Sequence, residues 1–562
     1  MKEFNWWQKT VVYQIYPRSF KDTTGNGIGD LKGIIEKLDY IKDLGIETIW
    51  ISPFYPSPTD KPYKEHDCGY DISDYRGINP LFGTMSDFET LVEEIHNRDM
   101  KLVMDMVMNH TSIEHPWFKE SRSNRDNPKR DWYIWKDGKK PNGKKPPTNW
   151  NGFLIKCWKY DELTDQWYYH AFLPFQPDLN YRNPDIQKEM LDTVRFWLKK
   201  GADGYRLDII NTLFEDAEFR DAPFTFKIFS DNLDTLFKSS KRNLNHPDTL
   251  EFCKKLRATI DEFPERFLVG EVTASLKTVK DYLGNISSDG KSHDGLNLSF
   301  QFQSLTTPFK AKSIRKLLHL YEEWFPYPYM PTWVFGNHDQ IRRITRLGDN
   351  FDKAKLNAVL QLTARGVPFI YYGEELGMKN YKAPKKNSRD AVSHHFNWVP
   401  QFLRNIAMKI GLMMNRDGCR TPMQWDSTEN AGFSNPGVET WLPVESSFKK
   451  RNVERELKNA SSLLNCYKRL LKIRKENLAL QIGNFEFIDL NKLNKKILAY
   501  KRIIAEKILY VFINFKDNII KIDPPKEEVE LLFSTLPNRI AISPESYEGK
   551  LALFPYEAII LK

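Results

Sequence analysis

The sequence GADGYRLDII, residues 201–210, joins the end of one predicted helix to a predicted buried strand. Gly201 suits a helix C-terminus, and the apolar run after it predicts the strand. Arg206 and Asp208 interrupt this run two positions apart. Because alternate residues of a strand point to the same side, both charges enter one space. Charged side chains are rarely buried unless they are paired or functional, so the pair indicates either a structural salt bridge or a reactive site.

Seven further apolar runs alternate with helical patterns along the first 480 residues, at 11–17, 47–54, 101–107, 266–272, 295–302, 332–339 and 367–375. Eight strands alternating with helices predict an α/β chain of the (β/α)8 TIM barrel class. A doubly wound parallel sheet is the alternative. The barrel is favoured because polar residues recur at the C-terminal ends of the strands, where barrel active sites lie. The helix before residues 101–107 is expected to begin with Ser86 and Glu89 as its capping box.

Two regions depart from this alternation. Residues 111–175 follow the third strand, contain no clean helical pattern and predict an inserted subdomain. Residues 483–562 contain strand-like runs with short polar turns and predict a C-terminal antiparallel β domain. The catalytic barrel would then comprise residues 1–110 and 176–482.

Composition narrows the class of protein. The 562 residues carry a net charge of +9 in short basic runs without a long basic arm, so nucleic-acid binding is disfavoured. The five cysteines are scattered without metal-ligand spacing. The N-terminal residues lack a signal-peptide pattern, and no apolar run reaches roughly 18 residues, so we expect a cytoplasmic protein without a membrane segment.

Carboxylates end three of the predicted strands, as Asp208, Glu271 and Asp339. In a closed barrel they would converge on one mouth, and close carboxylates separate in protonation state. A neutral acid beside an ionised carboxylate is what cleavage of a glycosidic bond needs. Arg206 would keep Asp208 ionised and oriented. A salt bridge that only stabilises the barrel remains the alternative, disfavoured because charged groups end four strands.

Five segments in chain order resemble the signature segments of the α-amylase family of glycoside hydrolases: MDMVMNH (104–110), QPDLN (176–180), GYRLDII (204–210), LVGEV (268–272) and FGNHD (335–339). QPDLN is similar to the segment typical of the oligosaccharide-cleaving α-glucosidase branch. WWQKTVVYQIYPRSF near the N-terminus and RDGCRTPMQWD (416–426) also resemble that branch.

The resemblance implies a retaining, two-step mechanism without a catalytic cofactor. Asp208 would be the nucleophile, Glu271 the general acid and base, and Asp339 the group that binds two hydroxyls of the distorted sugar. The other residues that match the family's sugar-binding positions are Asp67, Tyr70, His110, Phe153, Phe172, Gln176, Arg206, His338 and Arg420. A glucose ring enclosed in this way would make an exo-acting pocket for a small oligosaccharide.

The loop KDTTGNGIGD, residues 21–30, raises the question of a metal. Oxygen ligands in a glycine-rich loop suit Ca²⁺ or Mg²⁺. The resemblance gives Asp22, Asn26, Asp30 and the Ile28 carbonyl as ligands, with Thr24 where that branch often has asparagine. A structural cation is therefore expected, with a metal-free polar turn as the alternative.

Substrate preference is left open by the sequence. The segments before Asp67 and over residues 380–415 are unusually long, and both are expected near a second sugar. Ile209 resembles the residue that accompanies α-1,6 cleavage, whereas other segments resemble α-1,4-acting enzymes. A transglycosylase or sucrose isomerase is an alternative because DQIRRITRLG (339–348) carries three arginines. Trehalose-6-phosphate hydrolysis and a non-catalytic member are further alternatives, and the oligomeric state is also left open.

Overall fold

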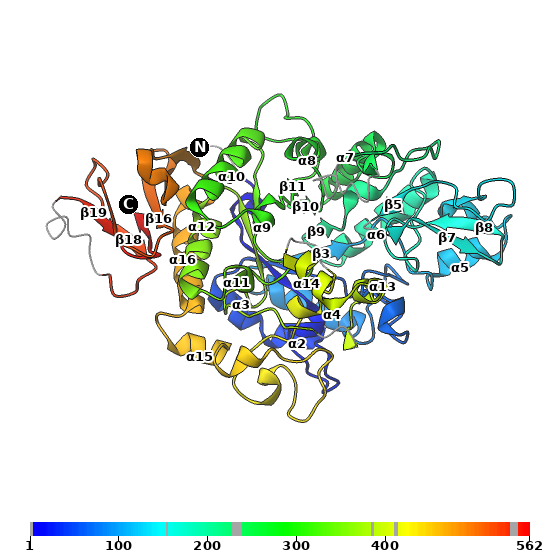
Figure 1. Cartoon of the computed structure of the whole chain (residues 1–562), viewed down its shortest axis with the longest axis horizontal. Helices are drawn as coiled ribbons and strands as arrows, with labels where there is room; N and C mark the ends of the chain where they lie inside the picture. Colours follow the sequence, from blue (N-terminus) through cyan, green and yellow to red (C-terminus); the bar gives the residue numbers. More distant parts are fainter. Residues whose placement is uncertain (1–3, 153–154, 227–238, 384–386, 410–413, 540–548) are drawn as a thin grey trace.

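The computed structural model describes residues 4–152, 155–226, 239–383, 387–409, 414–539 and 549–562. Its centre is an eight-stranded parallel sheet that curls into a nearly closed barrel, in the order β11-β10-β9-β3-β2-β1-β13-β12 (Figure 1). The strands are β1 (Val12–Ile15), β2 (Thr48–Ile51), β3 (Lys101–Met106), β9 (Gly204–Leu207), β10 (Phe267–Gly270), β11 (Leu298–Ser299), β12 (Thr332–Val334) and β13 (Val367–Tyr371). The predicted TIM barrel is confirmed, and the doubly wound sheet is wrong.

A side chain joins the two end strands of this sheet. The amide oxygen of Gln301, just after β11, accepts a hydrogen bond from the backbone N–H of Thr332 at 2.5 Å. The backbone N–H of Gln301 donates to the hydroxyl of Thr332 at 3.1 Å. The Gln301 side chain is fully buried, so these bonds satisfy groups that would otherwise be orphaned between β11 and β12.

Helices cover the outside of the barrel because each has one apolar face. The main ones are α2 (Leu31–Glu36), α3 (Leu38–Leu44), α4 (Met85–His96), α6 (Pro184–Lys199), α7 (Pro247–Asp261), α8 (Leu276–Leu283), α10 (Ala311–Trp324), α12 (Phe351–Thr363) and α16 (Leu463–Glu476). The capping box of α4 is formed by Thr84 and Asp87, so the expected box at Ser86 and Glu89 is wrong by two residues. Gly201 follows α6 with φ of 100°, as its predicted position after the helix requires.

A small antiparallel sheet follows β3 and lies at the right of Figure 1. It comprises β4 (Trp135–Lys136), β8 (Gln166–Tyr169) and β7 (Trp158–Asp161), and the pair β5 (Asn151–Gly152) and β6 (Ile155–Lys156) lies in the same region of the chain. The region also contains the eight-residue helix α5 (Pro116–Ser123), which the sequence did not predict. The inserted subdomain is therefore present, and its limits at 111 and 175 stay a prediction.

The C-terminal strands form an antiparallel sheet at the opposite end of the molecule, at the left of Figure 1. They are β14 (Asn484–Phe487), β15 (Ile497–Ile504), β16 (Lys507–Asn514), β18 (Leu531–Ser534) and β20 (Ala558–Leu561), with β17 (Ile520–Ile522) and β19 (Leu551–Leu553) paired beside them. The fully buried Arg502 of β15 donates to the carbonyls of Thr363, Leu480 and Gly483 at 2.6–2.9 Å. These bonds attach the sheet to the barrel.

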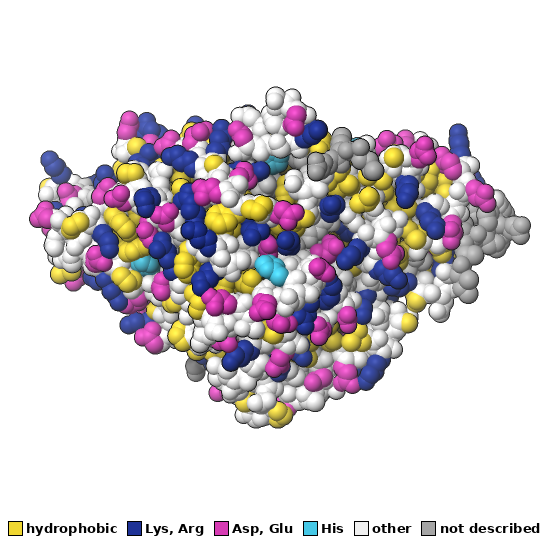
Figure 2. Space-filling view, turned by 180° about the vertical axis from the view of Figure 1, so that it is seen from behind, with side chains coloured by type: hydrophobic (Ala, Val, Ile, Leu, Met, Phe, Trp, Pro, Cys, Tyr) yellow, Lys and Arg dark blue, Asp and Glu magenta, His cyan; other side chains and the backbone are white. Residues whose placement is uncertain are grey.

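Lysines, arginines and acidic residues are interspersed over the face shown in Figure 2. In the part of the chain that the structure describes, no helix is long and apolar enough to cross a membrane.

Candidate active site

One guanidinium holds three carboxylates at the C-terminal ends of neighbouring strands. Nη1 of Arg206, in β9, lies 2.8 Å from Oδ1 of Asp105 in β3 and 2.7 Å from Oδ1 of Asp208, which follows β9. Nη2 of Arg206 contacts Oε2 of Glu271, which follows β10. Parallel pairing of β3, β9 and β10 brings these side chains to one edge of the barrel, as predicted from the sequence for Arg206, Asp208 and Glu271.

The charges around Asp208 do not balance. Burial, together with the nearby charges of Asp105 and Asp339, raises the pKa of Asp208 to about 7 against the lowering effect of Arg206. Burial also raises the pKa of Asp105. From the sequence we expected Arg206 to keep Asp208 ionised. Arg206 does lower the pKa of Asp208, but it is one cation shared by three carboxylates and offsets only part of the repulsion between them. The cluster therefore favours retaining a proton near neutral pH.

Asp339 follows β12 and lies in a different electrostatic environment. Its Oδ1 accepts from Nη2 of Arg420 at 2.8 Å and lies 3.3 Å from Nη1 of Arg416. Its Oδ2 lies 3.1 Å from Nε2 of His338. Burial works in the opposite direction, but His338, Arg416 and Arg420 together lower the pKa of Asp339. Its side chain is 32% exposed, against 10% for Asp208, so this anionic carboxylate is the more accessible one.

His338 is held as a neutral hydrogen-bonding group. Nε2 of Gln14, in β1, lies 2.7 Å from Nδ1 of His338, and an amide nitrogen only donates. The ring proton therefore lies on Nε2, which is 2.7 Å from the hydroxyl of Tyr70. The Tyr70 ring stacks on the His338 ring at 5.3 Å between centroids. Burial lowers the pKa of His338 to about 3, in agreement with a neutral ring.

Asp67 and Arg416 form an ion pair beside this group. Nη2 of Arg416 lies 2.5 Å from Oδ1 of Asp67. Arg416 was not predicted from the sequence, in which only Arg420 of the RDGCRTPMQWD segment was expected to bind sugar. Arg416 nevertheless contacts both Asp67 and Asp339. The signal was present in that motif, which contains both arginines.

The residues predicted to form the wall of the glucose pocket lie near the backbone carbonyl of Tyr70. Nε2 of His110 donates to the Tyr70 carbonyl at 2.9 Å, and Nε2 of Gln176 lies 3.1 Å from Nε2 of His110. The rings of Phe172 and His110 are 5.4 Å apart between centroids. Burial lowers the pKa of His110 to about 4. Phe153, the remaining predicted wall residue, lies outside the described residues.

Hydrogen bonds already satisfy the side-chain oxygens of the predicted metal loop. The Asp22 carboxylate accepts hydrogen bonds at 2.6–2.9 Å from four donors, the backbone N–H groups of Thr24, Gly25 and Gly27 and the hydroxyl of Ser434. Asp30 caps α2 through the N–H of Gly33 at 2.7 Å, and Oδ1 of Asn26 accepts from Ile28 at 2.8 Å. Among the residues described, no three His, Cys, Asp or Glu side chains are grouped to hold a metal. Calcium binding at this loop stays a prediction.

The three arginines after β12 serve the barrel itself. Nη1 of Arg342 donates to the carbonyl of Tyr372 at 2.8 Å, and Nε of Arg343 donates to Oδ1 of Asn357 at 2.8 Å. Arg346 donates to the backbone carbonyls of Leu305 and Phe335. These hydrogen bonds give the arginines a structural role and weaken the reason for expecting a sucrose-isomerase loop here.

The two unusually long segments contact each other. The guanidinium of Arg389 lies 4.7 Å from the ring centre of Tyr63, and the Cys68 thiol lies 3.7 Å from the Arg389 carbonyl. The second segment contains α13 (Ala391–His395) and α14 (Gln401–Lys409). Trp398 and Phe402 in this segment are exposed.

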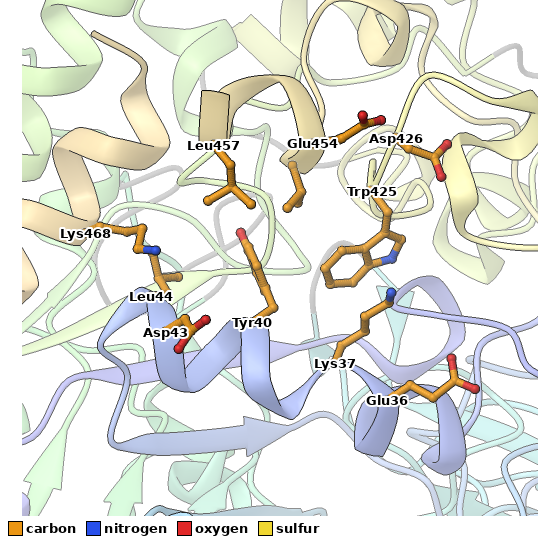
Figure 3. A pocket seen from close by; sticks show the side chains of 11 residues that line it. Glu36, Lys37, Tyr40, Asp43, Leu44, Trp425, Asp426, Glu454, Leu457 and Lys468 are labelled. Atoms are coloured by element: carbon orange, nitrogen blue, oxygen red, sulfur yellow. The ribbon is translucent and has the colours of Figure 1, made fainter. Parts of the chain in front are cut away.

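A separate cavity of about 580 Å³ lies on the outside of the barrel (Figure 3). Tyr40 and Lys37 from the α2–α3 region, Trp425, and Leu457 of α15 (Val453–Lys458) line it. Trp425 is nearly buried, and the Lys37 ammonium covers its ring at 4.7 Å. None of the residues predicted for catalysis lines this cavity.

Residues 14–483 match the model of the α-amylase catalytic domain. The chain belongs to the α-amylase family of glycoside hydrolases. It is similar to an oligo-1,6-glucosidase of Parageobacillus thermoglucosidasius, with 36% identity over 99% of each chain. It is also similar to a trehalose-6-phosphate hydrolase of Bacillus subtilis (strain 168), with 36% identity over 99% of this chain and 98% of that one. The crystal structure of the trehalulose synthase MutB from Pseudomonas mesoacidophila MX-45 superposes with a TM-score of 0.86 at 32% identity and covers 100% of both chains. The family resemblance predicted from the signature segments is confirmed, and the chain is a glycoside hydrolase that needs no catalytic cofactor.

Proposed function

We propose that this family member is a retaining, exo-acting α-glucosidase that hydrolyses the terminal non-reducing α-glucosidic bond of short oligosaccharides such as maltose and isomaltose. The observation that carries the proposal is the shared contact of Asp208 and Glu271 with Arg206. Carboxyl groups on one guanidinium are close together, which favours the spacing of about 5–5.5 Å in retaining enzymes over about 6.5–9.5 Å in inverting ones.

The proposed reaction has two steps. Asp208, in its ionised form, attacks the anomeric carbon while Glu271 donates a proton to the leaving oxygen, which releases the rest of the oligosaccharide and leaves a β-glucosyl ester on Asp208. Glu271, now ionised, then takes a proton from water, and the resulting hydroxide attacks the same carbon. Glucose leaves with α configuration and both carboxyl groups return to their starting states.

Asp339, His338 and Arg420 would bind the hydroxyls of the reacting glucose. Asp339 offers an ionised, partly exposed carboxylate, and the His338 ring is fixed by Gln14 and Tyr70. Charge-assisted hydrogen bonds of this kind are roughly twice as strong as neutral ones. His110, Gln176, Tyr70 and Phe172 would complete the wall.

The exo action is supported by the Asp67–Arg416 ion pair, in which both side chains are close to 90% buried. A paired Asp and Arg at this position would bind the non-reducing end of the glucose and leave no passage for a further sugar. The long segments that meet at Tyr63 and Arg389 would contact the leaving sugar, which makes them the first places to search for linkage preference.

The test is a hydrolysis panel of maltose, isomaltose, sucrose, trehalose, trehalose 6-phosphate and an aryl α-glucoside. Proton NMR of the first product separates the mechanisms, because a retaining enzyme releases α-glucose and an inverting enzyme β-glucose. The ratio of glucose to new disaccharide separates hydrolysis from the transglycosylase and sucrose-isomerase alternatives. Exclusive use of trehalose 6-phosphate would assign that alternative, and no turnover of any substrate would assign the non-catalytic one. The cytoplasmic location stays a prediction.

A further inference from the structure

Asp390 lies in the long segment ahead of the RDGCRTPMQWD motif, and the proposed reaction gives it no role. Its side chain is completely buried. One carboxylate oxygen accepts from Nε and Nη2 of Arg416 at 3.0 and 2.7 Å, and the other accepts from the backbone N–H of Arg416 at 2.6 Å. Three bonds to one residue fix both the backbone and the side chain of that arginine.

These bonds decide which edge of the Arg416 guanidinium faces the glucose site. Nε and part of Nη2 are directed at Asp390, Nη2 also contacts Asp67, and Nη1 points toward Asp339 at 3.3 Å. A planar guanidinium held along one edge has little freedom to rotate. Asp390 therefore orients the arginine without itself contacting Asp67 or Asp339 in the contacts described.

A second set of bonds joins the same two segments without involving Arg416. Oδ2 of Asp417 accepts from the hydroxyl of Ser388 at 2.7 Å and from the N–H of Arg389 at 2.9 Å. Asp390 also caps α13 by accepting from the N–H of Val392 at 3.1 Å. The Ser388 hydroxyl also accepts from the backbone N–H of Asp390 at 3.2 Å. The chain thus offers a control, because Ser388 secures the segment and the Asp390 backbone, while only the Asp390 carboxylate contacts the arginine.

We propose that Asp390 is the positioning residue of the glucose site: it holds Arg416 in the orientation that pairs with Asp67, and so sets the affinity for the terminal glucose. The inference rests on the proposed function and names a residue outside the resemblance on which that function was built. Without Asp390, Arg416 would be shared by Asp67 and Asp339 alone. Its guanidinium would then be free to shift toward Asp339 and loosen the Asp67 pair, because opposite charges at this distance attract strongly when buried.

The experiment compares Asp390→Asn with Ser388→Ala in calorimetric titrations with glucose and in hydrolysis of an aryl α-glucoside. Asparagine keeps the size of the side chain but removes its charge and one of its two acceptors. We expect Asp390→Asn to weaken glucose binding and raise KM by about tenfold while kcat changes by less than about threefold. Ser388→Ala is expected to leave both constants within about threefold of the parent.

A double-mutant cycle separates positioning from general stability. If Asp390 acts through Arg416, adding Asp390→Asn to Arg416→Ala should change glucose affinity by less than about twofold further. Asp390→Glu is the second variant if Asp390→Asn does not fold. It keeps the charge but moves the carboxylate, so it should weaken glucose binding, and the added methylene in this buried site should also lower Tm.

Glucose affinity and KM within about threefold of the parent in both Asp390 variants would overturn the proposal, and so would an equal loss in Ser388→Ala. The binding measurement does not depend on turnover. A parent enzyme that binds glucose but hydrolyses no α-glucoside would overturn the proposed function alone, and the titrations would still decide the role of Asp390. A parent that does neither would overturn both.

Discussion

Nη1 of Arg206 lies 2.7 Å from Oδ1 of Asp208, two residues along the same strand end. The same guanidinium also contacts Asp105 and Glu271. Arg206 is thus a common anchor that fixes the relative positions of the two carboxyl groups proposed to react. The roles of the proposed nucleophile Asp208, the proposed acid Glu271 and the neighbouring carboxylate Asp105 can be tested in separate variants.

Asp208→Ala should fold normally and lose at least about three orders of magnitude in kcat, because a missing covalent nucleophile removes several kcal/mol of transition-state stabilisation. Azide added with an aryl α-glucoside should enter from the vacated face and yield β-glucosyl azide. This product, identified by NMR, also serves as the control that the variant still binds substrate. Hydrolysis within tenfold of the parent, or an α-azide product, would contradict the assignment.

The acidic limb of kcat/KM against pH should lie near neutrality. Burial raises the pKa of Asp208 to about 7, and the nucleophile must be ionised, so activity should fall as the pH drops through that value. Asp105→Asn removes a neighbouring negative charge, which lowers the pKa of Asp208 and should move the limb to lower pH by about one unit.

Glu215→Gln is the matched control for this shift. Burial raises the pKa of Glu215 to about 7 as well, but Glu215 is not among the contacts of Arg206. The limb should stay in place in this variant. A limb that moves in Glu215→Gln and stays in Asp105→Asn would show that Asp208 is not the group that titrates.

Glu271→Gln should lose the alkaline limb of the profile, because glutamine has no proton to lose. It should still release the aryl group from a substrate with a good leaving group, which needs little protonation. Without the base for the second step, the glucosyl-enzyme should accumulate, and mass spectrometry should find the added glucosyl residue on Asp208. A complete bell-shaped profile in this variant would move the acid role to another residue.

Local sequence patterns predicted most of the side chains that the structure brings together here. Strand periodicity placed Arg206 and Asp208 on one side, and the apolar runs located the strand ends that carry Glu271 and Asp339. Which of Arg416 and Arg420 pairs with Asp67 depends on the orientation of the two guanidinium groups. In our proposal Asp390, which lies outside the RDGCRTPMQWD segment, sets that orientation. The spacing of residues in the sequence does not reveal how a guanidinium is oriented.

Tertiary contacts also explain the other differences between the sequence predictions and the structure. The arginines at 342, 343 and 346 could be counted in the sequence, but only packing shows that they bind the barrel's own carbonyls and Asn357. The closure of the barrel by the Gln301 side chain has no periodic signature either.

The loop at residues 21–30 gives a direct test of the metal prediction. Because backbone donors and Ser434 already satisfy Asp22, the EDTA-treated enzyme should keep its fold. If Ca²⁺ binds as predicted from the sequence, it should add about 2.7 kcal/mol at one hundred times its Kd and raise Tm. Asp22→Asn should abolish that increase. A Tm that is the same in EDTA and in millimolar Ca²⁺ would show that the loop is a metal-free turn.

Ile209, next to Asp208, adopts the left-handed conformation with φ of 34° and ψ of 51°. A β-branched residue is strained there, at a cost of about 1–2 kcal/mol. Ile209→Asn should relieve this strain and raise Tm, because asparagine tolerates the conformation. Ile209→Thr keeps the branching and the strain but removes bulk, and a change of one methylene in a binding wall alters discrimination by about 1–3 kcal/mol.

We therefore expect Ile209→Thr to raise the ratio of kcat/KM for maltose over isomaltose by about tenfold, while turnover of the aryl α-glucoside stays near that of the parent. Tm measured on both variants separates strain from bulk, since only the asparagine variant should become more stable. The decisive measurement is the disaccharide ratio in parent and variant. An unchanged ratio would exclude Ile209 as the determinant of linkage and direct attention to the contact between Tyr63 and Arg389, where the two long segments meet.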